Sequence, residues 1–186
     1  MRPLYISALA LSLAAFQAPT VLAEEGHKHL DAHEHGAGEL MVALEGNELL
    51  VEMRLSGMDV VGFEHAPENH EQHERVDQAL DKLKDATNIV ELPAAALCTQ
   101  EDAHITSPFQ DEHDQKNADE HEYEGETHSE FMAEYHFHCE APQKFDTLSV
   151  KAFATFPTLE DVDFQVFGPK GQMGGELEPN NAKIGF

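Results

Sequence analysis

The chain has 186 residues, of which 36 are acidic and only 11 are Lys or Arg, so its formal net charge is -25. Such a charge repels nucleic acid and anionic membrane surfaces and attracts cations. The 13 histidines are the second unusual feature, because imidazole is a common ligand of zinc and related metals. Composition therefore excludes a nucleic-acid-binding protein and indicates cations as the partner.

The first 23 residues have the pattern of a secretory signal peptide. Arg2 precedes an apolar run over residues 4–16, and Ala23 ends a short apolar segment before an acidic stretch. Cleavage there would leave residues 24–186, enough for a single domain with its own core. No stretch approaches the roughly 18 apolar residues that a membrane span needs, so we expect an exported protein without membrane insertion.

After residue 37, several segments have the alternation of apolar and polar residues that predicts β-strands. Residues 38–55, GELMVALEGNELLVEMRL, alternate apolar and polar on both sides of Gly46 and predict a β-hairpin. Residues 56–67 are expected to be irregular and extended up to Pro67. Further strands are predicted at residues 88–92, 147–156, 162–167 and 182–186.

One helix is predicted to start at Asn69. Gln72, three residues later, could complete a capping box, and apolar residues then recur at helical spacing at Val76, Ala79, Leu80 and Leu83. We therefore predict an α+β fold. It would consist of a mainly antiparallel β-sheet or sandwich framework, one covering helix and a long acidic, His-rich insert.

The two cysteines, Cys98 and Cys139, flank this insert. Export to an oxidising compartment favours an intramolecular disulfide between them, worth about 4 kcal/mol by the loop-entropy estimate. The insert itself, at about residues 99–134, is rich in His, Asp and Glu and has little apolar periodicity in its middle. We expect that segment to be flexible in the absence of a ligand.

The segment EYHFHC, residues 134–139, carries the clearest metal-binding pattern. In a strand, Tyr135, Phe137 and Cys139 would face the core while His136 and His138 face the other side. Two imidazoles on one face suit a tetrahedral zinc ion. The facing also separates Cys139 from the metal, which favours the disulfide. The alternative is a pair of surface histidines without a function.

The sequence favours metal binding more strongly for some of the other histidines than for the rest. His33 and His35 form a second His-x-His pair next to the first strand, and His65 follows an apolar segment, so we interpret these three as ligands. The insert offers weaker candidate sites at His104, His113, His121 and His128. Two groups stay open: a possible flexible tail at His27 and His29, and a possible metal site or solvated helix edge at His70, His73 and Asp77.

The ligand types narrow the choice of metal and of chemistry. Calcium prefers oxygen ligands and gains nothing from imidazole, so Zn²⁺ is expected first, followed by nickel or copper. The sequence holds no HExxH, no GxSxG and no phosphate-binding glycine loop. We therefore expect no enzyme activity.

Several segments resemble one family. HEHGAGELMVALEGNELLVEMRLSGMDVVGFEHAP, the ALC and FHC segments around the insert, and KGQMGGELEPNNAKIGF near the end are similar to the ZrgA-type zinc-regulated periplasmic proteins, formerly a domain of unknown function. The resemblance implies a periplasmic zinc-binding protein that captures Zn²⁺ for an inner-membrane zinc transporter. The ligands implied by the matching segments lie among His33, His35, His65, His136 and His138, with weaker sites in the insert.

Two other functions remain open at this point. The first is a passive metal buffer in the cell envelope, which would bind zinc, copper and nickel at many weak sites. The second is a protein-interaction β-module that uses its acidic loop for a partner. For the zinc-uptake reading, the expected partners are zinc ions and transporter components, and the chain is expected to be a monomer.

Overall fold

The computed structural model describes residues 35–109 and 129–186. The predicted hairpin is confirmed: β1 (Ala37–Glu45) pairs antiparallel with β2 (Glu48–Ser56). Gly46 in the connecting turn has a φ of +60°, a left-handed conformation that glycine adopts without a steric penalty. The hairpin places one row of apolar side chains on each strand toward the core.

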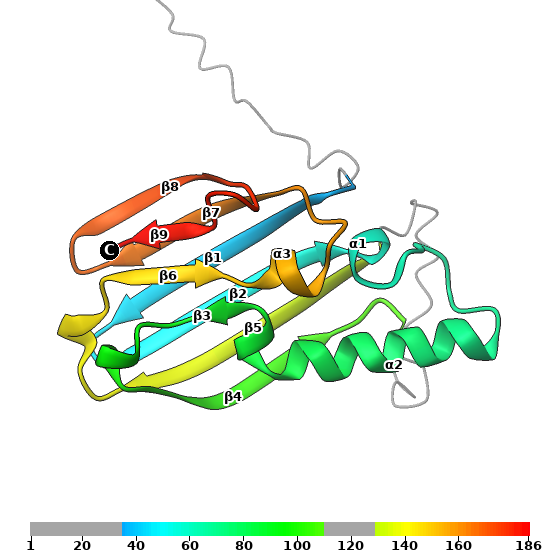
Figure 1. Ribbon diagram of the computed structural model, residues 1–186. Helices are drawn as coiled ribbons and strands as arrows, with labels where there is room; N and C mark the ends of the chain where they lie inside the picture. Colours follow the sequence, from blue (N-terminus) through cyan, green and yellow to red (C-terminus); the bar gives the residue numbers. More distant parts are fainter. Residues whose placement is uncertain (1–34, 110–128) are drawn as a thin grey trace, which may run out of the picture. The chain divides into compact units, whose positions relative to one another are not determined.

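This hairpin lies in the middle of a six-stranded sheet (Figure 1) with the order β4-β5-β2-β1-β7-β8. The outer strands are β4 (Cys98–Thr106), β5 (Glu130–Cys139), β7 (Asp161–Gly168) and β8 (Gly171–Leu177). All neighbouring strands are antiparallel except β1 and β7, which are parallel. Strand β8 was not predicted, because its sequence has three glycines and no apolar alternation.

A second layer covers one face of this sheet. A three-stranded sheet contains β3 (Val90–Glu91), β6 (Thr147–Val150) and β9 (Lys183–Gly185). Together with α2 (His70–Lys84) and α3 (Ala152–Thr155), it lies over one face of the six-stranded sheet (Figure 1). One continuous apolar core fills the space between the layers. The predicted α+β class, with mainly antiparallel strands and one main helix, is confirmed.

Helix α2 begins where the sequence predicts. The Asn69 side chain accepts the Gln72 N–H at 3.0 Å, and the Gln72 side chain accepts the Glu68 N–H at 2.7 Å. Near the other end, the Tyr135 hydroxyl donates to the Leu83 carbonyl at 2.6 Å. Burial raises the pKa of Tyr135, so the hydroxyl keeps its proton and ties α2 to the large sheet.

Two expected extended segments are helical instead. After β2, the chain forms α1 (Gly57–Val61), because the Ser56 side chain caps the helix by accepting the Asp59 N–H. After Val150 the alternating pattern is misleading. The N–H groups of Lys151 and Ala152 both donate to the Ile89 carbonyl, which turns the chain into α3. Short 3₁₀ turns complete the fold at Ala86–Asn88, Ala94–Ala96 and Pro142–Lys144.

The insert is shorter than the predicted range of residues 99–134. Strand β4 continues to Thr106 and β5 begins at Glu130, so both flanks of the insert are paired strands. The register starts with Cys98 opposite Cys139, and the predicted disulfide joins them. No helix among residues 35–109 and 129–186 is long and apolar enough to cross a membrane. Residues 1–34, including the predicted signal peptide, lie outside the described part of the chain.

The disulfide should contribute a large part of the stability. Replacing both Cys98 and Cys139 with Ala should lower the free energy of unfolding by about 2–4 kcal/mol, because the unfolded chain gains the freedom of the opened loop. Urea unfolding followed by circular dichroism measures this. Dithiothreitol should weaken the wild-type chain to a similar degree and leave the variant unchanged. A loss below about 1 kcal/mol would contradict the expectation.

Candidate metal-binding sites

The EYHFHC segment lies in β5 and has the predicted facing. Tyr135, Phe137 and Cys139 are buried against the second layer, while His136 and His138 lie on the opposite face of the large sheet. We call this other side the open face. It presents the outward side chains of all six strands. The alternation of a strand therefore separates the disulfide from the two imidazoles, as the sequence indicates.

Each of these two histidines has a carboxylate of its own. His136 Nε2 donates to Glu134 Oε1 at 2.8 Å, and His138 Nδ1 donates to Glu48 Oε1 at 2.9 Å. Glu48 comes from β2, where it lies opposite His138. The two histidines are about 6.7 Å apart along the strand. They can share one ion only if their side chains turn away from these carboxylates.

Strand β4 adds further ligand types to the same face. His104 lies opposite Glu134, and Asp102 lies opposite His136. His104 was expected in the insert, but it belongs to a paired strand and is exposed. We refer to these residues as the β-face cluster: Glu48, Asp102, His104, Glu134, His136 and His138.

A second group forms where β1 begins. His35 Nε2 lies 3.3 Å from Glu64 Oε1, and His65 follows directly in the chain. The His65 ring stacks on Phe63 with 5.2 Å between ring centroids, and its Nδ1 donates to the Ala66 carbonyl at 2.9 Å. We call His35, Glu64 and His65 the loop cluster. The third predicted ligand of this region, His33, lies outside the described residues.

Asp59 positions the loop cluster. Its two carboxylate oxygens accept the Gly36 N–H at 3.1 and 3.0 Å, and Oδ2 also accepts the Ser56 hydroxyl at 2.7 Å. Asp59 is only 6% exposed and lies in the first turn of α1, where helix N–H groups favour a negative charge. These bonds fix Gly36, the neighbour of His35, against the end of β2 and the start of α1.

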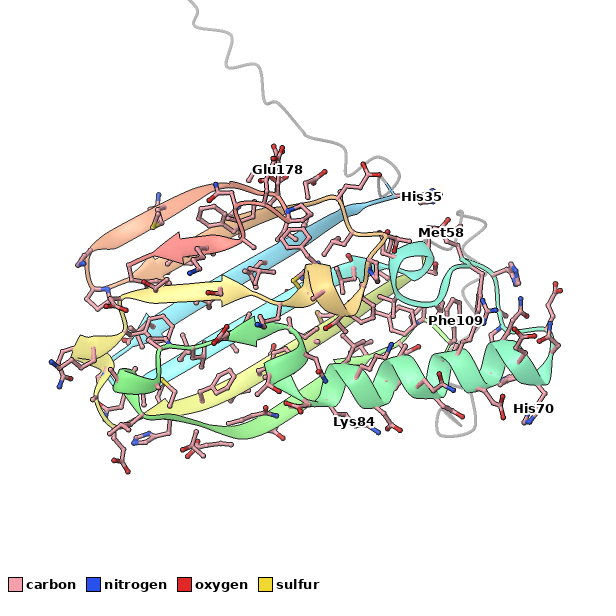
Figure 2. The ribbon with its side chains drawn as sticks, in the orientation of Figure 1. His35, Met58, His70, Lys84, Phe109 and Glu178 are labelled. Atoms are coloured by element: carbon pink, nitrogen blue, oxygen red, sulfur yellow. A yellow bond between two sulfur atoms is a disulfide. The ribbon has the colours of Figure 1, made fainter. Side chains whose placement is uncertain are left out.

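The insert leaves the sheet at this same end. Phe109, the last described residue before it, packs against Phe63 and Phe131 with 5.7 Å between ring centroids in both pairs. On the return, the Ser129 carbonyl accepts the Gly57 N–H at 2.6 Å. In Figure 2, His35, Met58 and Phe109 are labelled near one end of the strands. The insert histidines His113, His121 and His128 lie outside the described residues.

The two clusters are separate. Glu130, at the start of β5, pairs with Ser56 at the loop-cluster end, whereas His138 lies eight residues further along β5, or about 27 Å. The candidate ligands His35 and His65 therefore cannot share an ion with His136 and His138. Within residues 35–109 and 129–186, no three His, Cys, Asp or Glu side chains are placed to hold a metal ion together.

The positions of His70, His73 and Asp77 favour a solvated helix edge over a metal site. His70 is 88% exposed and lies 3.2 Å from Glu74, one turn away on α2. His73 and Asp77 are exposed as well. Figure 2 labels His70 at one end of α2. This arrangement matches a solvated helix edge.

Sequence reasoning missed the carboxylate partners. Glu134 is separated from His136 by one residue, so the strand pattern of EYHFHC already places them on one face. Glu48 and Glu64 carried no such signal. They are 90 and 29 residues from their histidines, and only the strand register and the Asp59 contact bring them together.

The Glu48 carboxylate raises the pKa of His138. A raised pKa means that the favourable His138–Glu48 interaction is present at low pH and is lost as pH rises through that value. Glu48→Gln should therefore lower the pKa of His138. NMR titration of the imidazole carbon-bound protons tests this. An unchanged His138 titration would mean that the pair is not formed in solution.

Removing the Asp59 side chain should destabilise the loop cluster. Asp59→Ala leaves the Gly36 N–H and the Ser56 hydroxyl without their buried acceptor, which should cost about 2–3 kcal/mol in urea unfolding. The NMR signals of His35 and His65 should shift at the same time. Asp81→Ala, an exposed change on α2, is the matched control and should alter stability by less than about 0.5 kcal/mol.

A family described as ZrgA family zinc uptake protein matches residues 32–186, which contain both clusters and the whole insert. No curated protein sequence matches the chain. The family match spans most of the 186 residues, and the chain therefore belongs to the ZrgA family of zinc uptake proteins.

Proposed function

We propose that this chain captures Zn²⁺ in the periplasm and passes it to an inner-membrane zinc transporter. The family match supports a role in zinc uptake. The disulfide between Cys98 and Cys139 supports an oxidising compartment, and the signal-peptide pattern of residues 1–23 supports export. Zinc is here the cargo and not a resident cofactor.

The β-face cluster is the observation that carries this proposal. It places three histidines and three carboxylates on one solvent-facing surface, yet no three of them converge. Structural zinc sites are closed, with four ligands around the ion. An incomplete set of exposed ligands suits a cargo ion, because an incoming ligand from another protein can replace one bound ligand at a time.

Two imidazole nitrogens from β5 and one further ligand from β4 or β5 would bind the ion. His136 and His138 supply imidazoles from β5. His104 or Glu134 would complete the set after the present histidine–carboxylate bonds are exchanged for bonds to the metal. The carboxylates also have a second use, since hydrogen bonds from metal-bound imidazoles to carboxylates orient the rings and strengthen their binding.

The loop cluster would provide a second site of the same kind. His35 lies 3.3 Å from Glu64, His65 follows Glu64 in the chain, and His33 is two residues from His35. We propose that His33 completes this site. The chain's net charge of -25 would raise the local concentration of divalent cations around both sites.

Calorimetric titration of the metal-stripped chain with Zn²⁺ at pH 7.5 tests the proposal. Replacing His104, His136 and His138 together with Gln should remove one class of tight sites or weaken it at least tenfold. The matched control replaces His70 and His73 with Gln, which should leave the titration unchanged. A third variant replaces His113, His121 and His128. If only this third variant loses zinc, the described clusters are not the capture sites.

The same titration and a growth assay at low zinc distinguish the alternative functions. A passive buffer would show many weak sites and similar affinities for nickel and copper. A β-module that acts through a protein partner would support growth at low zinc even when the ligands of both clusters are replaced by Gln. Submicromolar zinc binding, with a growth defect of the variants only when zinc is scarce, would support capture and delivery. We propose no catalytic role for the chain.

A further inference from the structure

Strand β8 forms an accessible edge of the large sheet. Among the described residues it pairs only with β7, and residues 171–176 are all exposed. Its sequence, GQMGGEL, has no Pro and only one charged residue, Glu176. Proteins normally protect an edge strand with charges, Pro, a bulge or a covering element, because its free N–H and C=O groups can pair with another chain.

The opposite edge strand, β4, has such protection. A register shift interrupts its pairing between Gln100 and Asp102, and the acidic Glu101 lies within that irregular stretch. The Gln100 side chain also donates to the Lys84 carbonyl and accepts the Ala86 N–H, both at 3.2 Å, which joins β4 to the end of α2. Of the two edge strands of the large sheet, β4 is therefore protected against pairing with another chain and β8 is not.

An apolar groove lies beside β8 on the covered side of the sheet. It has a volume of about 230 Å³ and its apolar lining includes Leu44, Phe145, Val166, Met173 and Phe186. Met173, opposite the buried Val166, is 45% exposed and lines this groove. It is one of three large hydrophobic side chains exposed in the described part of the chain; the others are Leu97 and Phe167, and Phe167 lies on the open face. The edge therefore offers a pocket for an apolar side chain.

The open side of the same edge is acidic. Glu39 on β1 lies opposite Asp163 on β7, and Asp163 lies opposite Glu176 on β8. Like charges directly opposite one another destabilise a sheet. Arg54 is next in this row, opposite Glu39, but its Nε donates to Glu52 at 2.8 Å. A cationic side chain from another molecule would offset the repulsion within this row.

We propose that the β8 edge binds an extended segment of a partner protein, with apolar side chains on one side and Lys or Arg on the other. Added strands of this kind gain affinity from backbone hydrogen bonds and specificity from pockets for alternate side chains. On β8 the apolar side chains would lie beside Met173 and enter the groove. The basic side chains would lie beside Glu176 on the acidic side.

The charge distribution favours such a partner over a second copy of this chain. Two copies would each bring a formal charge of -25, and their acidic rows would come close at a shared edge. A basic segment gains from the same field. The proposal does not depend on the histidines, so its test is independent of zinc binding.

Two labelled peptides added to the full-length chain test the proposal, KVKVKVK and its acidic counterpart EVEVEVE. Fluorescence anisotropy should detect binding of the basic peptide only. Amide hydrogen exchange measured by NMR should show new protection within residues 171–177 and none in β4. Equal binding of both peptides, or protection that does not include β8, would overturn the proposal.

Two variants and one control variant locate the interaction. Met173→Glu places a charge beside the groove and should weaken binding of the basic peptide at least tenfold. Leu97→Glu changes the third exposed hydrophobic residue, away from β8, and should have no effect. Glu176→Lys should weaken the basic peptide and strengthen the acidic one. Because Glu176 is exposed, this second variant keeps the test valid if Met173→Glu fails to fold.

A second copy as the occupant would give a different result. Analytical ultracentrifugation would then show a dimer that Met173→Glu dissociates and Leu97→Glu does not. That outcome would overturn the proposed partner. A monomer that binds KVKVKVK at β8 would support it, with or without zinc in the sample.

Discussion

The Gly36 N–H donates to both oxygens of the Asp59 carboxylate. The loop-cluster end of the sheet depends on this contact. A buried carboxylate is costly unless donors surround it, and here the donors come from the start of β1 and the end of β2. Because Asp59 requires these donors, Gly36 is held in place just before β1. The neighbouring His35 lies beside Glu64, although nothing in either segment alone would bring them together.

At the other end, strand pairing decides which side chains could meet a metal ion. The side chains of β5 alternate, so its aromatic residues stabilise the core while its histidines stay in water. Neighbouring strands then add Glu48 and His104 through their registers. The stability of the fold thus depends on one face of this strand, and its proposed function depends on the other. Ligands on the open face can therefore change with little cost to the core.

Local patterns predicted those elements whose cause is local. The β1–β2 hairpin, the start of α2 at Asn69 and the facing of His136 and His138 each follow from a few adjacent residues. The parallel pairing of β1 with β7, the strand β8 and the partner Glu48 depend on segments far apart in the sequence, which a single sequence does not reveal. The expected strand through Phe156 was wrong for the same reason. The Ile89 carbonyl, more than 60 residues away, accepts the N–H groups that turn the chain after Val150.

The position of the disulfide couples the maturation of the chain to its location. Cys98 and Cys139 are the first pair in the β4–β5 register, and the same register brings His104 opposite Glu134. Before oxidation, the pairing with β5 and the Gln100 bonds to the end of α2 hold β4 in place, but no covalent link joins the two strands. Under the proposed export, oxidation would therefore lock the β4–β5 register only after the chain has left the reducing cytosol.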